Sequence, residues 1–165
     1  MKYFDTLTNE MVEFAPREPG KVSIYACGPT VYDVPHLGHA RTALTYDVIA
    51  RFLRWRGFEV TMVANITDID DKIIQRAAAE GTTETAIAET YTKAYIDQMD
   101  RLNIVHPEHR PHATEYVDEM QDVIQQLIDR EHAYVIDGQG VYFSVASFED
   151  GYGKLVHRSA EDLRE

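Results

Sequence analysis

The sequence is short of cysteine and of long apolar runs, and each shortage excludes a class of protein. Cys27 is the only cysteine among 165 residues, so no disulfide can form within the chain. This usage is typical of a reducing compartment, and we expect a cytoplasmic protein. No apolar run approaches the roughly 20 residues that span a bilayer, and the first residues lack the basic and apolar segments of a signal peptide. We therefore expect no membrane partner.

Positive charge is also scarce. Lys and Arg number 16 against 28 Asp and Glu, which gives a net charge of -12. Binding to phosphates needs clustered basic side chains, so an RNA partner would be held mainly by something outside this chain. A well-solvated surface is the simpler reading of the acidity. The 44% hydrophobic content and ten tyrosines indicate a folded globular chain, long enough for one domain or a domain with part of a second.

The first half of the chain predicts a β-α-β unit. Residues 22–27 alternate apolar and polar side chains, which favours a strand, and residues 58–66 form a second β-rich run. Residues 38–56 between them predict an amphipathic helix that Gly57 ends. The apolar face of this helix is formed by Leu44, Val48, Phe52 and Trp55, flanked by Ile49 and Leu53.

The two strands are expected to be parallel neighbours joined by a right-handed crossover. Both would then end at the same edge of the sheet. Cys27 and the sequence HLGH (residues 36–39) follow the first strand, and Thr67 and Asp68 follow the second. Ligands of open α/β sheets bind beyond the carboxyl ends of the strands. The sequence therefore brings its two most unusual segments to one crevice.

The rest of the chain predicts helices, a loop and a hairpin. Asp70 and Asp71 favour a helix start and Gly81 a stop. The proline- and histidine-containing segment 103–114 predicts a loop or a boundary. The other expected elements are a helix at 84–102, with Ile87, Tyr91, Tyr95, Met99 and Leu102 on its apolar face, a helix at 114–130, a hairpin at 133–145 that turns at 137–140, and a largely polar tail from residue 147.

The segment HLGH can contact phosphates. Two imidazoles at a helix N-terminus can donate hydrogen bonds to phosphate oxygens, assisted by free backbone N–H groups. Gly38 would let a bulky nucleotide approach the backbone. Fixed donors aimed at the α-phosphate stabilise the transition state of nucleotidyl transfer. The alternative is that His36 and His39 are surface or helix-capping residues.

Cys27 and the acidic segment 65–72 each have two readings. A lone cysteine at a strand end is usually a small buried hydrophobe, and its functional reading is a thiolate ligand to zinc. The other histidines show no convincing ligand spacing.

Asp70 and Asp71 are explained by a helix dipole, whereas Thr67 and Asp68 lie closer to the crevice and are candidates for substrate contact. For Thr114 and the residue after it, a helix cap is simpler than ligand contact.

Several of these segments resemble cysteinyl-tRNA synthetase. YACGPTVYDVPHLGHAR, NITDIDDKII, PHATEY, AYV and YGKL occur in the order and spacing of the N-terminal half of that family, from about Thr6 onward. The resemblance implies a class I synthetase that makes cysteinyl-adenylate from ATP and charges the tRNA. It also implies an α/β fold: residues 1–111 would be the N-terminal half of a Rossmann-like catalytic domain with a parallel sheet. Residues 112–165 would begin a mixed α+β connective insertion.

The resemblance assigns roles to individual residues. It places His36 and His39 on the ATP phosphates as catalytic residues, and makes Cys27 the first of four zinc ligands. ATP would act with Mg²⁺, and cysteine and its tRNA would be the other substrates. The expected ATP-binding residues are Thr30, His36, Gly38 and His39, and the expected substrate-binding residues are Gly28, Thr67 and Asp68.

Other parts of the family pattern are missing. The remaining zinc ligands, the lysine-rich KMSKS loop and the anticodon-binding region do not occur in these 165 residues. We therefore expect an N-terminal portion of a full enzyme that is inactive alone, with a naturally short relative as the main alternative. Two other functions stay open. One is a cysteine ligase with a non-tRNA amine acceptor, as in mycothiol synthesis, and the other is a non-catalytic nucleotide-binding regulatory module.

Overall fold

The computed structural model describes residues 1–148 and 151–158, and its contacts divide the chain into two units. The parallel unit is Pro16–Tyr116, and the hairpin unit is Met1–Ala15 together with Val117–Glu165. This division follows contacts within the chain, and the domain boundary expected between residues 111 and 112 stays a prediction. In the described part of the chain, no helix is long and apolar enough to cross a bilayer.

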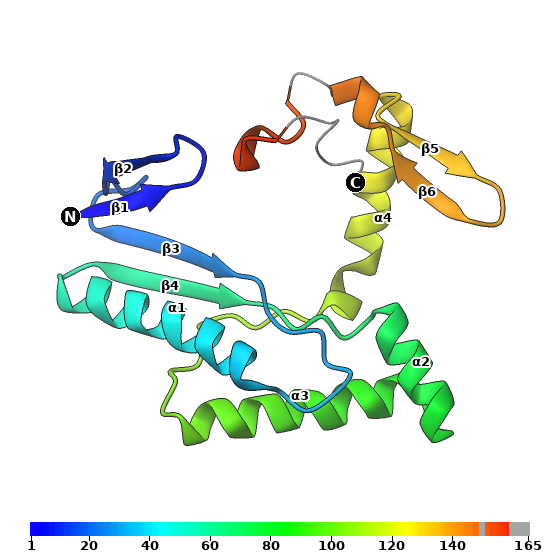
Figure 1. The fold of residues 1–165 in the computed structure, drawn as a ribbon, viewed down its shortest axis with the longest axis horizontal. Helices are drawn as coiled ribbons and strands as arrows, with labels where there is room; N and C mark the ends of the chain where they lie inside the picture. The colour runs from blue at the N-terminus through cyan, green and yellow to red at the C-terminus, as the bar shows by residue number, and fades with distance from the viewer. Residues whose placement is uncertain (149–150, 159–165) are drawn as a thin grey trace. The chain divides into compact units, whose positions relative to one another are not determined.

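The parallel unit contains the predicted β-α-β arrangement (Figure 1). Strand β3 (Lys21–Ala26) pairs in parallel with β4 (Glu59–Ala64) along its whole length, and helix α1 (Leu37–Trp55) connects the two strands. The predicted strands and helix are confirmed to within a few residues at each end. Gly57, with φ of 90°, occupies the left-handed conformation expected just beyond the helix.

The segment after the helices adds to this sheet. The sequence predicts a loop over residues 103–114, but His109 and His112 form parallel backbone bridges with Val63 and Ile66. The amide of Ile66 donates to the carbonyl of Pro111 at 2.9 Å. A third extended segment therefore lies beside the end of β4. Isolated bridges separated by prolines carry no strand periodicity, so the sequence pattern does not reveal them.

Helices α2 (Asp71–Glu80) and α3 (Glu84–Arg101) begin and end where the sequence predicts. The Asp70 carboxylate caps α2 by accepting from the amide of Lys72 at 2.9 Å. Gly81 ends the helix in the left-handed conformation. The dipole-and-cap reading of this acidic segment is therefore confirmed for Asp70.

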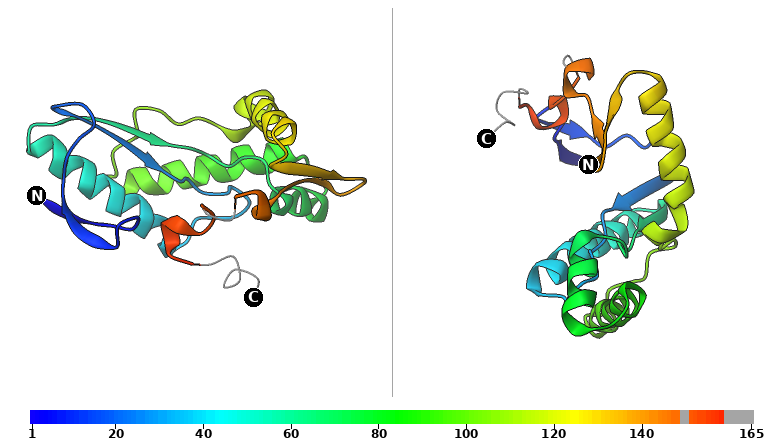
Figure 2. Two further views of the ribbon diagram at one scale, coloured as in Figure 1. Left: turned by 90° about the horizontal axis from the view of Figure 1, so that it is seen from above. Right: turned by 90° about the vertical axis from the view of Figure 1, so that its right-hand side faces the viewer.

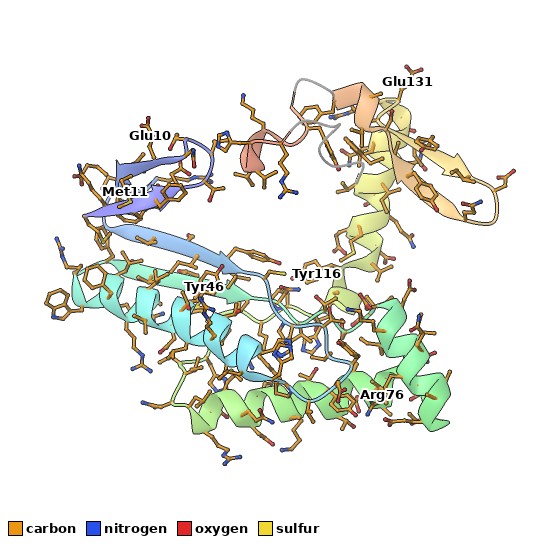
Figure 3. The ribbon with its side chains drawn as sticks, viewed as in Figure 1. Glu10, Met11, Tyr46, Arg76, Tyr116 and Glu131 are labelled. Carbon is orange, nitrogen blue, oxygen red and sulfur yellow. The ribbon has the colours of Figure 1, made fainter. Side chains whose placement is uncertain are left out.

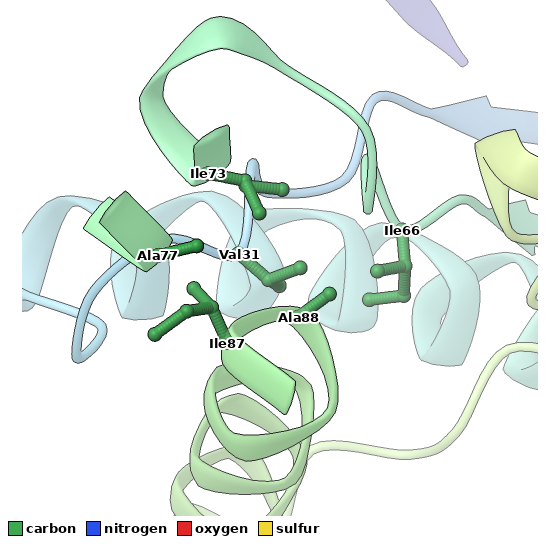
Figure 4. Close-up of a cluster of buried hydrophobic side chains, with 6 residues drawn as sticks. All are labelled: Val31, Ile66, Ile73, Ala77, Ile87 and Ala88. Atoms are coloured by element: carbon green, nitrogen blue, oxygen red, sulfur yellow. The ribbon is translucent and has the colours of Figure 1, made fainter. Parts of the chain in front are cut away.

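The core of the parallel unit lies where α2 and α3 meet the loops that follow the strands (Figure 4). Tyr91 and Tyr95 of α3 pack against this cluster, in agreement with the apolar face predicted for that helix, whereas Leu102 is exposed. The buried residues of this cluster are Val31, Ile66, Ile73, Ala77, Ile87 and Ala88. Two members, Val31 and Ile66, come from the loops that follow β3 and β4, so the core fixes those loops directly.

Helix α1 is fastened by a buried carboxylate. Asp47 is 5% exposed, and it accepts from Nε of Arg51 at 2.8 Å and from the amide of Val105 at 3.0 Å. Arg51 also donates to the carbonyl of Asn103 at 2.7 Å. Because a buried charge is costly without partners, this set of bonds ties α1 to the chain segment that leads into the third extended segment.

The face on which α1 packs differs from the predicted one. Ala50 and Leu53 are buried against the sheet together with Asp47. The four residues predicted to form the apolar face are exposed, with Leu44 48% and Trp55 77% exposed, whereas Leu53, predicted to flank them, is buried. The prediction that this face forms the packing surface is wrong for the described chain. Small side chains let the helix approach the strands closely, and residue size is not part of a hydrophobic periodicity.

The hairpin unit contains two antiparallel hairpins. Strands β1 (Lys2–Asp5) and β2 (Glu10–Glu13) pair at the N-terminus, and the sequence analysis did not predict them. The Asp5 carboxylate accepts from the amides of Leu7 and Thr8, each at 3.3 Å. These bonds form the turn, and an aspartate ahead of threonine and asparagine was the available signal.

The C-terminal part of the hairpin unit follows its prediction. Helix α4 (Val117–Asp129) leads to strands β5 (Ala133–Ile136) and β6 (Gly140–Phe143), shown from two further sides in Figure 2. Glu131, labelled in Figure 3, takes a φ of 61° in the connection between α4 and β5. The tail predicted from residue 147 is described only in part, and residues 149–150 and 159–165 lie outside the described residues.

Removing the Asp47 carboxylate tests the role of α1 in the fold. In Asp47→Ala, the Arg51 guanidinium and the Val105 amide lose their acceptor, so we expect the free energy of unfolding to fall by about 3 kcal/mol. Urea denaturation followed by circular dichroism measures this loss. Asp97→Ala is the matched control, because Lys93 and Asp97 form an exposed pair at the same helical spacing. Its cost should stay below about 1 kcal/mol, and equal losses in both variants would contradict the assignment.

Candidate functional site

The loops that follow β3 and β4 are joined by backbone hydrogen bonds. The amide of Val31 donates to the carbonyl of Thr67 at 3.2 Å, and the amide of Thr67 donates to the carbonyl of Pro29 at 3.0 Å. Thr30 and Thr67 therefore lie side by side in a parallel bridge. The structure confirms that the two strand ends meet, and it brings two of the sequence-predicted site residues together.

Asn65 holds these loops together through its side chain. Its Oδ1 accepts from the amide of Gly28 at 2.8 Å and from the Tyr25 hydroxyl at 3.2 Å, and its Nδ2 donates to Oγ1 of Thr67 at 3.2 Å. A Cβ added at Gly28 would lie 1.5 Å from the Asn65 carbonyl oxygen. Gly28 is therefore required for the close approach of the two loops. The role of Asn65 was not predicted, although a polar residue near the end of the β-rich run 58–66 was a signal.

Cys27 lies at the carboxyl end of β3, and its side chain is exposed. The thiol is 3.8 Å from the carbonyl of Gly28, a contact within its own loop. The reading of Cys27 as a buried hydrophobe is therefore wrong, and the thiol is accessible to a ligand. A small cavity of about 40 Å³ is lined by Cys27, Gly28 and Asn65 together with Tyr95 of α3. Burial raises the pKa of Tyr95, and nearby Arg110 lowers it in part.

His36 and His39 form a reciprocal cap at the start of α1. Nδ1 of His36 accepts from the amide of Gly38 at 3.0 Å, and the amide of His36 donates to Nδ1 of His39 at 3.1 Å. Their ring centroids are 4.0 Å apart and the rings are inclined by 32°. The capping alternative is thus confirmed. It does not exclude ligand contact, because each ring uses only Nδ1 in these bonds.

The cap also fixes the tautomer of both rings. An Nδ1 atom that accepts a backbone hydrogen bond carries no proton, so the neutral ring carries its proton on Nε2. Burial, followed by the neighbouring His36, lowers the pKa of His39 below its ordinary value. His39 is therefore neutral near pH 7. Two N–H donors, one from each ring, thus stand at the N-terminus of a 19-residue helix, while the amides of Gly38 and His39 already donate to His36.

Asp68 anchors the third extended segment at the end of β4. Its Oδ1 accepts from the amide of Thr114 at 3.0 Å, and its Oδ2 accepts from the Thr114 hydroxyl at 2.6 Å. Oδ2 also lies 3.1 Å from Nδ1 of His112. The Thr114 hydroxyl serves Asp68 instead of capping a helix, so the predicted cap is wrong. His112 is a site residue that the sequence analysis missed, because its partner lies 44 residues away.

These bonds keep Asp68 ionised. Burial by itself raises the pKa of Asp68, but the hydrogen bonds from Thr114 and His112 outweigh burial and leave that pKa below its ordinary value. An ionised carboxylate requires that Nδ1 of His112 donate to it. Beside this cluster lies a cavity of about 770 Å³, lined by Asp68, His112 and Thr114 and by side chains of α2 and α3.

Zinc binding needs more residues than the described chain gathers. A zinc site takes three or four protein ligands, and in the described ranges no three His, Cys, Asp or Glu side chains are grouped so that they could hold a metal ion. Two histidines of the segment 106–112 have other contacts. The His106 side chain contacts Asp100, and the backbone of His109 forms hydrogen bonds with Met62 and Ala64 of β4. Cys27 can supply one ligand, and a zinc shell would need the others from elsewhere.

The Asp68 cluster makes a prediction about stability against pH. Because the folded-state pKa is lowered, Asp68 contributes stability that is present at neutral pH and is lost as the pH falls below its ordinary pKa. We expect Asp68→Asn to cost about 2 kcal/mol at neutral pH and less at pH 3, where the stability contributed by the lowered pKa has begun to be lost. Urea denaturation at both pH values measures the difference. Glu89→Gln, at an exposed position on α3, is the control, and its free energy of unfolding should differ little from that of the parent chain at either pH. If the free energy of unfolding of Asp68→Asn depends on pH as that of the parent chain does, the assigned role of Asp68 is refuted.

Residues 13–165 match the family model of the tRNA synthetases class I (C) catalytic domain. The chain is 50% identical over 164 residues to the cysteine–tRNA ligase of Solidesulfovibrio magneticus, covering 99% of this chain and 34% of that protein. It is also 50% identical over 164 residues to the cysteine–tRNA ligase of Halorhodospira halophila, covering 99% and 36%. The chain thus spans about a third of the length of the curated relatives it matches.

Solved structures share the fold. The agnB2 LeuRS of Agrobacterium radiobacter K84, in a ternary complex with tRNA and LeuAMS, matches with a TM-score of 0.66 at 20% identity, over 84% of this chain and 23% of that one. The methionyl-tRNA synthetase of Mycobacterium tuberculosis, in complex with methionyl-adenylate, matches with a TM-score of 0.57 at 25% identity, over 68% and 23%. The Rossmann-like α/β class expected from the sequence is confirmed. With the family match over residues 13–165, the chain belongs to the class I (C) tRNA synthetase catalytic-domain family.

Proposed function

We propose that this chain is the ATP- and cysteine-binding N-terminal portion of a longer enzyme that activates L-cysteine and transfers it to cysteine tRNA. The proposal rests on one observation above all: both imidazoles at the start of α1 use Nδ1 in the reciprocal cap, which leaves their Nε2–H groups for a ligand within the described part of the chain. Its relatives, named cysteine–tRNA ligases, support the amino-acid specificity. A cytoplasmic location, expected from the single cysteine, belongs to the same proposal.

The chemistry follows from the donors. In activation, a carboxylate oxygen of cysteine attacks the α-phosphorus of ATP and pyrophosphate leaves, so negative charge grows on the phosphates. The Nε2–H groups of His36 and His39 would donate to that charge, beside the positive end of the α1 dipole. Gly38 is needed by the cap, since a Cβ there would lie 2.7 Å from the His36 ring, and its contact with the phosphates stays a prediction. Mg²⁺ would be carried by the phosphates themselves.

The amino acid would lie at the joined strand ends. Thr30 and Thr67 are adjacent there, Gly28 permits the close approach, and Cys27 presents an exposed thiol. Asp68 is already saturated by Thr114 and His112, so we assign it the positioning of those residues. This assignment replaces a direct contact between Asp68 and the substrate.

Zinc would complete the cysteine site with Cys27 as one ligand and the others from the rest of the enzyme. Soft zinc binds a thiolate better than a hydroxyl, so it would separate cysteine from serine by chemistry rather than by shape. The tRNA would be held mainly outside this chain, whose net charge of -12 disfavours an RNA grip. Two alternative functions stay open. A cysteine ligase would transfer the activated cysteine to an amino sugar instead of tRNA, and a regulatory module would bind the nucleotide without catalysis.

Pyrophosphate exchange tests the proposal. We expect cysteine-dependent exchange in the longer enzyme, tRNA charging with the same amino acid, and no exchange by these 165 residues alone. Exchange followed by charging of an amino sugar instead of tRNA would establish the ligase alternative. ATP binding without exchange in the longer enzyme would establish the regulatory module.

His39→Ala in the longer enzyme is expected to lower the rate of cysteine-dependent exchange about 100-fold or more, because a transition-state donor is lost. The cap is lost as well, so a stability decrease of about 1 kcal/mol should accompany it, and urea denaturation checks that the fold remains. His106→Ala is the matched control, since His106 is an exposed histidine that contacts Asp100. Near-normal exchange in a folded His39→Ala enzyme would remove the assigned role.

Cys27→Ser in the longer enzyme is expected to lower bound zinc and to raise activation of serine relative to cysteine. Oxygen is a poorer zinc ligand than a thiolate, so both changes have one cause. Elemental analysis of the purified enzyme measures the metal independently of activity. Ser23→Ala, an exposed change on the same strand, is the control. Unchanged zinc content in Cys27→Ser would exclude this cysteine as a ligand.

A further inference from the structure

The cavity of about 770 Å³ beside α2 and α3 has no role in the proposed function. We call it the α2–α3 cavity. Its volume is typical of small-molecule sites, and every residue that lines it belongs to the parallel unit. Within the described residues, its lining includes none of the side chains assigned to the cysteine site, namely Cys27, Gly28, Thr30 and Thr67. The cavity is therefore a separate place at which a ligand can bind.

The wall of the α2–α3 cavity is largely apolar. Ile73 and Ile74 come from α2, and Ala88 and Ile96 come from α3. Ile73 and Ala88 also belong to the buried cluster of Figure 4, so part of the wall is fixed by the core. Such a wall favours a ligand with an apolar body, because contact removes apolar surface from water.

The charged groups of the cavity are mostly acidic, and two of them are unpaired. The carboxylates of Glu84 and Glu89 form neither a hydrogen bond nor an ion pair within residues 1–148 and 151–158. The other carboxylates have partners inside the chain. The charged side chains that line the cavity are Asp68, Asp70, Glu84, Glu89, Asp97 and Lys93. An excess of negative charge therefore surrounds the apolar wall.

Thr92 of α3 supplies a second unpaired polar group. It lines the cavity, and its hydroxyl oxygen is enclosed without a hydrogen-bond partner among the described residues. A buried hydroxyl without a partner is unfavourable. Threonine in a helix takes more than one rotamer, so rotation about χ1 can turn the hydroxyl toward the cavity. A polar group of a ligand would then give it the partner that the chain does not supply.

The lining selects an organic cation among the possible ligands. An anion would be repelled by Glu84 and Glu89. A metal ion is disfavoured, because no three His, Cys, Asp or Glu side chains in the described part of the chain are grouped to hold one. A neutral apolar compound would crowd these carboxylates without offering them a counterion.

We infer that the α2–α3 cavity binds an organic amine that carries an apolar body. The body would lie against the isoleucines, and the ammonium would lie between Glu89 and Thr92. These two residues are three apart on α3 and are therefore neighbours on its surface. Hydrogen bonds from an ammonium to a carboxylate are strengthened by charge, so Glu89 would contribute more than Thr92. The inference does not depend on the proposed function.

Phenethylamine is a suitable probe, because it joins an ammonium to a phenyl ring. The longer enzyme is labelled with ¹³C at the isoleucine methyl groups, and the amine is added. We expect saturable shifts of the Ile73 and Ile96 methyl resonances, which report on the cavity, and no shift of Ile49 on exposed α1 surface. Phenethyl alcohol has the same ring without the charge. It should bind at least about tenfold more weakly.

Glu89→Gln tests the charge. We expect it to weaken binding of phenethylamine about fivefold or more and to leave binding of phenethyl alcohol unchanged, because only the amine uses the carboxylate. Glu59→Gln is the matched control, since Glu59 is exposed on β4 and does not line the cavity. It should bind the amine as the parent enzyme does. An unchanged affinity in Glu89→Gln would overturn the inference.

Thr92→Val tests the hydroxyl with almost no change in volume. We expect it to weaken amine binding about threefold or more without lowering the free energy of unfolding, because the hydroxyl has no partner to lose. Thr90→Val, at an exposed position of the same helix, is the control and should leave binding unchanged. A less stable Thr92→Val enzyme with unchanged amine affinity would make the hydroxyl a structural group and refute its role.

Competition separates this site from the proposed function. We expect cysteine and ATP to leave amine binding unchanged. Displacement of the amine by cysteine would make the cavity part of the cysteine site, and equal binding of the alcohol and the amine would make it an unselective apolar site. Either result, or the absence of shifts at Ile73 and Ile96, overturns the inference. None of these readouts uses pyrophosphate exchange, so their failure is separate from failure of the proposed function.

Discussion

The hydrogen bond from the Gly28 amide to the Asn65 side chain is the contact on which the site depends. It joins the loop after β3 to the loop after β4, at a separation that only glycine allows. Thr30 and Thr67 can pair because the loops are held at this distance. The same approach brings Val31 and Ile66, which follow the two strands, into one hydrophobic cluster with α2 and α3. Packing and site geometry are therefore fixed by one close approach.

Much of the fold follows from local signals in the sequence. The β-α-β unit, the caps of α2 at Asp70 and Gly81, and the turn between β5 and β6 are determined by residues close together in the chain. The packing face of α1 is not. Periodicity identifies the apolar stripe of Leu44 and Val48, but the strands select Ala50, whose small side chain allows close contact. Which of two apolar faces is covered depends on partners that a periodicity does not contain.

The candidate site was predictable to a similar extent. The paired histidines and the lone cysteine stand out because they lie together in the segment after the first predicted strand, but the exposure of the thiol could not be predicted. Asn65 and His112 do not stand out, because their roles come from bonds to Gly28 and Asp68, each across about 40 residues of sequence. The N-terminal hairpin was missed for a related reason. Its turn depends on the Asp5 carboxylate, and its strands have only four residues each.

The reciprocal histidine cap has a consequence for how the site handles protons. A bound anion would normally draw a proton onto a nearby imidazole. Here a proton on Nδ1 of His39 would face the amide proton of His36, so charging that ring would cost the hydrogen bond between them, about 1 kcal/mol. The cap therefore opposes protonation of His39 at Nδ1. Because both Nδ1 atoms are engaged by the helix, an anion can meet only the two Nε2–H groups, and the cap fixes their directions.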